Sequence, residues 1–303
     1  MQGHPRKTIE NDMPIPELLN RAQRGDIECQ YWAGLRYFQG EGVPKDTHKA
    51  VDFCTMAADG GDVRAYAFLA YCSSHGIGMT KSIRKSTKMY RISAKAGYAP
   101  AQYSLGLFYL NGKGLKKNVR TAIAWFERAA RQNYTCALVT LGNLYHQGED
   151  VVQYDQKACG YYRAAAELGS PAGQYMLSKM LIGGFGVARD PLKAFELLDE
   201  AAAKRYDAAV KMQAHFDEFF NFDPKEAGYE GFPIDHPFPI RRRTAIGLFC
   251  LETPCYQTMA RDIYDYVKEF PEHEEAAMKD VAVLLKTSTE GRNIPLPIFW
   301  CQG

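Results

Sequence analysis

A pattern of small, turn-forming residues recurs every thirty-six positions, and this period constrains the fold more than any other feature of the chain. One set of positions holds Gly25, Gly61, Gly97, Asn133 and Gly169, followed less regularly by Arg205. Fifteen residues after the first five come Gly40, Gly76, Gly112, Gly148 and Gly184. Because a unit of this length is too small to bury its own apolar face, neighbouring units must stack on one another. We therefore expect a solenoid, an architecture that serves recognition more often than catalysis.

Each unit is expected to form two antiparallel helices, and the third unit shows this most clearly. Its first helix is predicted over residues 100–110, with an inward stripe of Ala101, Leu105 and Tyr109. Its second helix is predicted over residues 118–131, with a buried face of Ala122, Trp125 and Ala129. Two helices of this length joined by a short loop form a hairpin. Gly112 is well placed to end the first helix in the left-handed conformation.

The same unit carries the pattern Ala-x-x-x-Leu-Gly-x-x-Tyr-x-x-Gly-x-Gly, at Ala101, Leu105, Gly106, Tyr109, Gly112 and Gly114. The fourth unit repeats most of it, whereas the second has Ser73 at the tyrosine position and Ser86 at a downstream alanine position. This pattern resembles the Sel-one-like repeat family, relatives of the tetratricopeptide repeat. The resemblance implies an α/α solenoid that acts as an adaptor or inhibitor in protein complexes, in some members as an immunity protein against a toxin. It brings no catalytic residues with it.

The period divides the chain into three parts, all of them expected to be helical or extended. An N-terminal segment (residues 1–24) is expected to hold one lone helix, Ile15–Arg24, and the solenoid of about five repeats follows over residues 25–219. Residues 220–303 lack the period and are rich in phenylalanine and proline, so they are interpreted as a cap over the last repeat, with helices at 256–270 and 272–286. A partner contact through Phe299 and Trp300 is the alternative for this segment.

Several function classes find no support in the residues. The first residues are basic but no apolar run follows them, and no stretch reaches the roughly 20 apolar residues that span a bilayer, so we expect a cytoplasmic protein without a membrane contact. The eight cysteines do not recur at one register, which indicates reduced thiols rather than a disulfide framework. The histidines show no metal-ligand spacing, and the glycine pairs follow the repeat period, which makes them loop caps. We therefore predict no enzyme, cofactor, metal or small-molecule substrate.

Charge is concentrated in the middle of the solenoid. Residues 63–134 hold thirteen lysines and arginines against a single acidic residue, Glu127, which gives that stretch a net charge of +12 in a chain of +2. Such asymmetry predicts an acidic partner. Within residues 81–95 the cations fall on one continuous face of a helix, with Ile83 and Tyr90 opposite. The predicted basic face comprises Lys81, Arg84, Lys85, Lys88, Arg91, Lys95, Lys113, Lys116, Lys117 and Arg120.

A second candidate surface is apolar. Seven and ten residues after each anchor, side chains are expected on the concave face, where a solvated surface would be polar. These positions hold Trp32, Leu35, Phe68, Tyr71, Leu107 and Met176. Exposed apolar groups of this size are typical of interaction surfaces. The competing interpretation is that neighbouring helices or the C-terminal segment cover them.

These observations favour a non-catalytic scaffold that binds an acidic protein, with a toxin-neutralising immunity protein as one form of it. A regulatory adaptor in signalling or secretion remains an alternative in the same class. A nucleic-acid-binding protein that uses the basic second and third repeats is the alternative from another class. It is less favoured because the isoelectric point is only about 8.0 and no nucleic-acid-binding motif is present.

Overall fold

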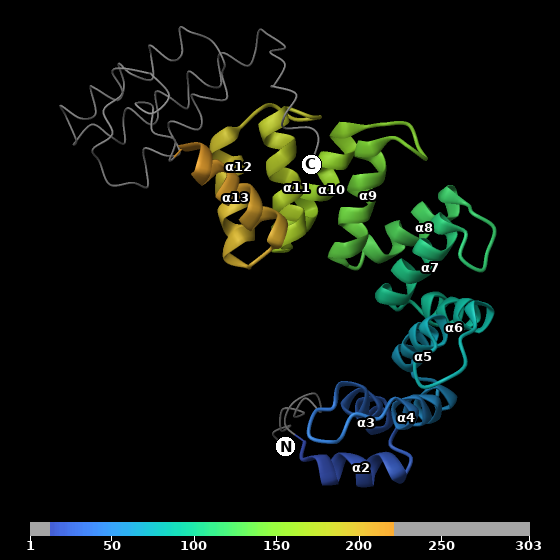
Figure 1. The fold of residues 1–303 in the computed structure, drawn as a ribbon. Coiled ribbons are helices and arrows are strands. Elements are labelled where there is room, and N and C mark those ends of the chain that lie inside the picture. Colours follow the sequence, from blue (N-terminus) through green and yellow to red (C-terminus); the bar gives the residue numbers. More distant parts are fainter. Residues whose placement is uncertain (1–12, 221–303) are drawn as a thin grey trace, which may run out of the picture. The chain divides into compact units, whose positions relative to one another are not determined.

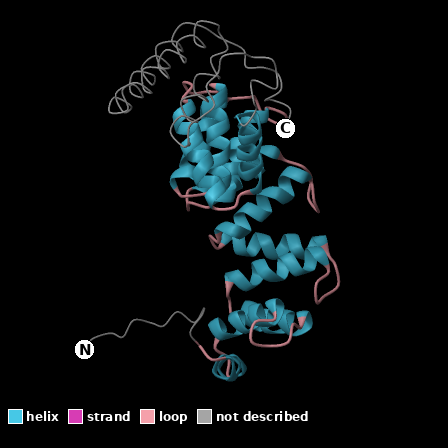
Figure 2. Ribbon diagram, turned by 60° about the vertical axis from the view of Figure 1, so that its left-hand side comes forward, coloured by secondary structure: helices cyan, strands magenta, loops and turns pink. Residues whose placement is uncertain are grey.

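A computed structural model describes residues 13–220, and within them it contains twelve α-helices and no strand (Figures 1 and 2). The chain divides into two compact units, Met1–Ala137 and Leu138–Gly303, and each is described by itself. The predicted all-α fold of consecutive helical hairpins is confirmed.

The first unit holds a lone helix and three hairpins. The helix α2 spans Ile15–Gln23, one residue shorter than predicted. The hairpins are α3 (Ile27–Gln39) with α4 (Thr47–Asp59), α5 (Val63–His75) with α6 (Ile83–Lys95), and α7 (Ala99–Asn111) with α8 (Val119–Ala130).

Helix α9 (Thr135–Gln147) begins at the junction of the two units. It is followed by α10 (Asp155–Glu167), α11 (Pro171–Gly183), α12 (Pro191–Ala203) and α13 (Asp207–Phe220).

The periodic small residues are the turns of this architecture. All six anchors have a left-handed backbone, including the two that are not glycine, Asn133 at a φ of 60° and Arg205 at 58°. The glycines that end the first helix of each hairpin are left-handed as well, as at Gly112, where φ is 64°. Since only glycine adopts this conformation without a steric penalty, the period in the sequence is a period of chain reversals.

Side chains at the helix starts complete the turns. The N–H of Cys29 donates to Asp26 at 3.0 Å at the start of α3, and the N–H of Lys49 donates to Asp46 at 3.0 Å at the start of α4. The hydrogen bond from Cys29 holds the pKa of Asp26 below its ordinary value. Such caps satisfy N–H groups that have no partner inside the helix.

Within a hairpin the two helices meet at a small residue. A Cβ added at Gly106 would lie 2.5 Å from Cε1 of Phe126, and one added at Gly142 would lie 2.4 Å from Cε1 of Tyr162. Both rings are fully buried. The glycine in the first helix thus makes room for an aromatic ring from the second helix.

The buried face of α8 differs in one residue from the prediction. Ala122 and Ala129 are fully buried as expected, but the ring between them is Phe126. Trp125 is only half-buried at the flank of the cluster, where the Arg128 guanidinium lies 4.4 Å from its ring centroid. A tryptophan one position from the helix midline can cover the rim of the core, while the smaller phenylalanine fits against Gly106.

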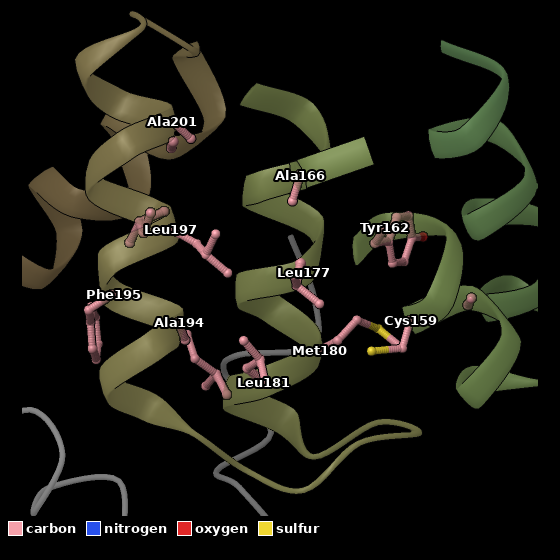
Figure 3. Close-up of a cluster of buried hydrophobic side chains, with 14 residues drawn as sticks. Cys159, Tyr162, Ala166, Leu177, Met180, Leu181, Ala194, Phe195, Leu197 and Ala201 are labelled. Atoms are coloured by element: carbon pink, nitrogen blue, oxygen red, sulfur yellow. The ribbon is translucent and has the colours of Figure 1, made fainter. Parts of the chain in front are cut away.

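Each unit has its own apolar core. In the first unit, residues of α4, α5 and α6 share one cluster around Val51, Cys54, Leu69 and Cys72, with Met89 packed against it. In the second unit, Leu177, Met180 and Leu181 of α11 lie between side chains of α10 and α12 (Figure 3). Every hairpin is therefore buried only by contact with its neighbours, as expected for a solenoid.

The proposed domain boundaries at residues 24 and 219 stay predictions. The expected C-terminal cap, its helices at 256–270 and 272–286, and Phe299 and Trp300 lie outside the described residues.

Candidate interaction surface

The predicted basic face lies entirely in the first unit, on α6, α8 and the turns that precede them. Arg84, Lys85, Lys88, Arg91 and Lys95 are on α6, and Arg120 is in the first turn of α8. Lys81 precedes α6, which begins only after the N-cap Ser82, and Lys113, Lys116 and Lys117 lie in the turn between α7 and α8. All ten are exposed except Arg91, which is half-buried.

Acidic residues are scarce around these cations in the sequence. Glu127 is the one acidic residue between 63 and 134, and helix α6 contains no acidic residue. The first turns of α6 and α8 contain Arg84, Lys85 and Arg120 and no acid. Cations at this end of a helix oppose its dipole at a cost of a few tenths of a kcal/mol each. Their N-caps, Ser82 and Asn118, are neutral, whereas α4 and α12 begin at Asp46 and Asp190.

The basic face is not continuous, contrary to the sequence interpretation. Ile92 lies between Lys88 and Lys95 on the outward side of α6, and 47% of its surface is exposed. At 100° per residue, residue 92 falls inside the basic arc, between Lys88 and Lys85, so the sequence contained this signal. A count of charges along the arc does not include this apolar side chain.

Most of the apolar candidates are half-buried rather than fully exposed. Trp32, Leu35 and Phe68 are half-buried and pack against the cluster of α4 and α5, and Leu107 is half-buried as well. Tyr71 is the most exposed of the set, at 41%, and its ring lies 4.4 Å from that of His75. The competing interpretation, cover by neighbouring helices, therefore accounts for much of this surface.

Met176 is not brought together with the other apolar candidates. It packs against the cluster of the second unit, whereas the other five belong to the first. Within the first unit the structure adds Phe38, whose ring meets that of Phe68 edge to face at 5.2 Å. Phe38 lies just before the turn glycine Gly40 and not at either of the two periodic positions, so the period did not indicate it.

An arginine closes one end of this apolar surface. The Arg64 guanidinium pairs with Asp62 at 2.6 Å and lies 4.4 Å from the ring centroid of Tyr31 and 6.0 Å from that of Trp32. The indole N–H of Trp32 is buried without a hydrogen-bond partner. Burial also raises the pKa of the Tyr31 hydroxyl. The charge of Arg64 is thus already engaged on its own chain.

Other chemistry finds few candidates in the described part of the chain. No group of three or more His, Cys, Asp or Glu side chains among residues 13–220 could hold a metal ion, and no helix there is long and apolar enough to cross a bilayer. Four of the five cysteines in this part are buried, and Cys136 is exposed. Burial raises the pKa of the Cys29 thiol to about 11, which keeps it protonated and unreactive near neutral pH.

Five consecutive copies of one family model cover most of the described solenoid. The model is named Sel1 repeat, and it matches residues 27–62, 63–98, 99–134, 137–170 and 171–206. The chain belongs to the Sel1 repeat family. Each match begins at or next to the first helix of a hairpin, so the family repeat and the structural hairpin coincide. Proteins of this family are generally protein-interaction scaffolds.

Solved structures place the fold in the same family. A Sel1 repeat protein from Oxalobacter formigenes is 28% identical, with a TM-score of 0.61 over 66% of this chain and 79% of that one. The protective antigen c5321 of uropathogenic Escherichia coli, described as displaying an SLR fold, is 23% identical with a TM-score of 0.61. That alignment spans 92% of this chain and 64% of the antigen.

An immunity protein, Pa5087 from Pseudomonas aeruginosa, is also similar, at 19% identity over 77% of this chain and 86% of that one. Its TM-score of 0.47 is too low to support any functional argument. No curated protein matches the chain.

Proposed function

We propose that this Sel1 repeat protein is a non-catalytic cytoplasmic scaffold that binds an acidic protein through the basic face of its second and third repeats. The observation that supports the proposal is the unbalanced charge of α6, α8 and the turns before them. The exposed cations of α6 have no acidic residue on their own helix, and those in the first turns of α6 and α8 oppose the helix dipole, so the fold gains little from them. An acidic partner turns the same cations into a favourable contact that speeds association and selects the partner.

The apolar surface of the first two repeats supplies a second contact in this proposal. Tyr71 of α5 is exposed, and Phe68 of the same helix and Leu35 and Trp32 of α3 are half-buried. Aromatic side chains in partly desolvated positions are typical anchors of protein interfaces and act mainly on the dissociation rate. The basic face then brings the partner in, and the apolar surface retains it. Neutralisation of a toxin is one form of this function, and regulation as an adaptor is another.

The test is capture of the partner by the full chain and by two variants of equal net charge. The first variant carries Arg84→Glu, Lys113→Glu and Lys116→Glu, three exposed residues of the basic face. The control carries Arg24→Glu, Arg163→Glu and Lys211→Glu, which are exposed elsewhere on the chain. We expect the first variant to associate at least about tenfold more slowly with a weaker salt dependence, and the control to match the unmodified chain.

Two results would contradict the proposal. If the basic-face variant and the control captured the partner equally, the charge of α6 and α8 would have no role in recognition. If nuclease treatment removed the captured material, the ligand would be a nucleic acid rather than an acidic protein. Identification of the captured protein by mass spectrometry then separates a toxin from a signalling or secretion component.

A further inference from the structure

Helices α4 and α6, the second helices of two consecutive hairpins, carry the same pattern of side chains with opposite charge. On α4 the pattern is Asp52, Met56 and Asp59, here called the acidic stripe. On α6 it is Lys88, Ile92 and Lys95, here called the basic stripe. The two triplets are thirty-six residues apart, so they occupy equivalent positions of the first and second repeats.

All six side chains face solvent. The four charged residues are exposed, and Met56 and Ile92 are two of the large apolar side chains most open to solvent in the first unit, at 42% and 47%. The residues of each triplet are four and three positions apart, so they form a straight outward stripe about 10 Å long. The pattern does not continue, because Ala124, Arg128 and Arg131 hold the equivalent positions of α8.

The two stripes belong to helices that pack against one common helix, α5. Val51 and Cys54 of α4 share an apolar cluster with Leu69 and Cys72 of α5, and Met89 of α6 packs against the same cluster. The outward sides of α4 and α6 make up the proposed contact surface. Helices at equivalent positions of consecutive repeats run in the same direction, so the acidic and basic stripes are parallel. This surface therefore has a negative half, a positive half, and an apolar residue in the middle of each half.

Such a surface is complementary to itself. A two-fold axis parallel to the helices and between them would place α4 of one copy against α6 of the other. Asp52 would then face Lys88, Met56 would face Ile92, and Asp59 would face Lys95, and the symmetry would repeat each contact once. Isologous contacts of this kind are the commonest form of homo-oligomer. We propose that the protein forms a two-fold dimer through the acidic and basic stripes.

The rest of the two helices defines where the contact is centred. Lys49 of α4 would approach Lys85 of α6 in the other copy, which is unfavourable. Lys49, however, is directed toward its own chain, 3.8 Å from Asp46 and 5.3 Å from the ring centroid of Tyr37. The contact is therefore centred on the C-terminal halves of α4 and α6. Lys88 and Lys95 belong to both contacts, so the dimer would cover part of the basic face. Lys81, Lys113 and Lys116, in the turns before α6 and α8, lie outside the two stripes and would remain open to the acidic partner.

Charge reversal in trans tests this arrangement directly. One variant carries Lys88→Asp and Lys95→Asp, which makes both stripes acidic, and the other carries Asp52→Lys and Asp59→Lys, which makes both basic. Each variant alone places like charges opposite each other, so we expect its dimer dissociation constant to rise at least about tenfold. In an equimolar mixture every contact is restored between unlike copies, so we expect a heterodimer as stable as the unmodified dimer.

Sedimentation equilibrium of the full chain under reducing conditions measures the dissociation constants, and circular dichroism verifies that both variants are folded. As a matched control, Arg84→Glu with Lys116→Glu changes the charge by the same amount outside the stripes and should leave the dimer intact. The proposal is wrong if the unmodified chain is monomeric at all concentrations, if both variants dimerise as the unmodified chain does, or if their mixture stays monomeric. None of these outcomes bears on capture of an acidic protein.

Discussion

Ser86 is a buried polar group that the second repeat does not satisfy, and its replacement by alanine should stabilise the protein. Its side chain is fully buried on α6, and its hydroxyl has no hydrogen-bond partner. The equivalent position is a fully buried alanine in every other repeat, at Ala50, Ala122, Ala158 and Ala194. The site therefore accommodates alanine without any change of the backbone.

The magnitude follows from two contributions of the same sign. A buried hydroxyl without a partner costs about 1–3 kcal/mol relative to its hydration in the unfolded chain. Alanine is also the better helix former, by about 0.5 kcal/mol. The substitution removes the volume of one oxygen atom only, and fully buried alanines pack at the four equivalent positions. We expect Ser86→Ala to raise the free energy of unfolding by about 1–2 kcal/mol, which corresponds to about 2–6 °C in Tm.

Ser93 on the same helix supplies the matched control. It is equally buried, but its hydroxyl donates to the carbonyl of Val63 at 2.6 Å. Ser93→Ala loses a hydrogen bond of about 1 kcal/mol and gains about 0.5 kcal/mol of helix propensity, so it should be neutral or slightly destabilising.

Thermal melts followed by circular dichroism and urea titrations compare the two variants with the unmodified chain. Native-state hydrogen exchange of α6 amides reports whether the gain is local, as expected for a repeat protein. The reasoning is refuted if Ser86→Ala leaves stability unchanged or lowers it, or if the two variants shift the melting temperature equally. Either result would mean that the hydroxyl of Ser86 is satisfied in solution.

Three further predictions concern the turns and the contacts within hairpins. Gly106→Ala should destabilise the fold by about 1–3 kcal/mol in urea titrations, because the new Cβ would lie 2.5 Å from the buried ring of Phe126. The control is Gly160→Ala, whose Cβ would meet nothing within 4 Å. Arg205→Gly should stabilise by about 0.5–1 kcal/mol because it removes the strain of a left-handed arginine at a φ of 58°, and an unchanged or lower Tm would contradict this. Asp26→Asn should flatten the acid dependence of Tm. Because the pKa of Asp26 is lowered in the folded protein, its carboxylate stabilises the fold at pH values above its ordinary pKa of 3.8. This contribution is lost as the pH falls through the lower pKa of the folded state. Asparagine keeps the helix cap without the charge. Melts between about pH 5 and about pH 2 would show equal slopes for both proteins if this is wrong.

The hairpins could be predicted from the sequence because backbone geometry determined both their turns and their spacing. A left-handed turn is costly for any residue with a side chain, so Gly25, Gly61 and Gly97 mark the ends of units directly. The exceptions Asn133 and Arg205 were still found, because the period between the glycines predicted their place. Repetition thus supplied a signal that no single residue contained.

The buried face of each helix could be predicted less well. Adjacent residues point in directions about 100° apart, and packing against the neighbouring helix determines which of them is buried. Trp125 and Phe126 are both large and apolar, and helical spacing alone did not show which ring enters the hairpin. The space left by Gly106 selects Phe126. The same limit applies to Trp32, Leu35 and Phe68, since their cover depends on side chains of the adjacent repeat that a helical pattern within one repeat does not include.

The basic face shows that a pattern of charges in the sequence does not by itself define an interface. The lysines and arginines of α6 indicated an excess of positive charge, but a count of charges does not include Ile92. Ile92 is exposed on α6, and Met56 is exposed at the equivalent position of α4. The two helices therefore share an exposed apolar residue that the charge count does not show. An acidic partner accounts for the cations alone. Met56 lies between two acidic residues and Ile92 between two basic residues, so a partner that contacts both helices needs a basic half and an acidic half. A second copy of the same chain is the partner whose sequence already contains that match.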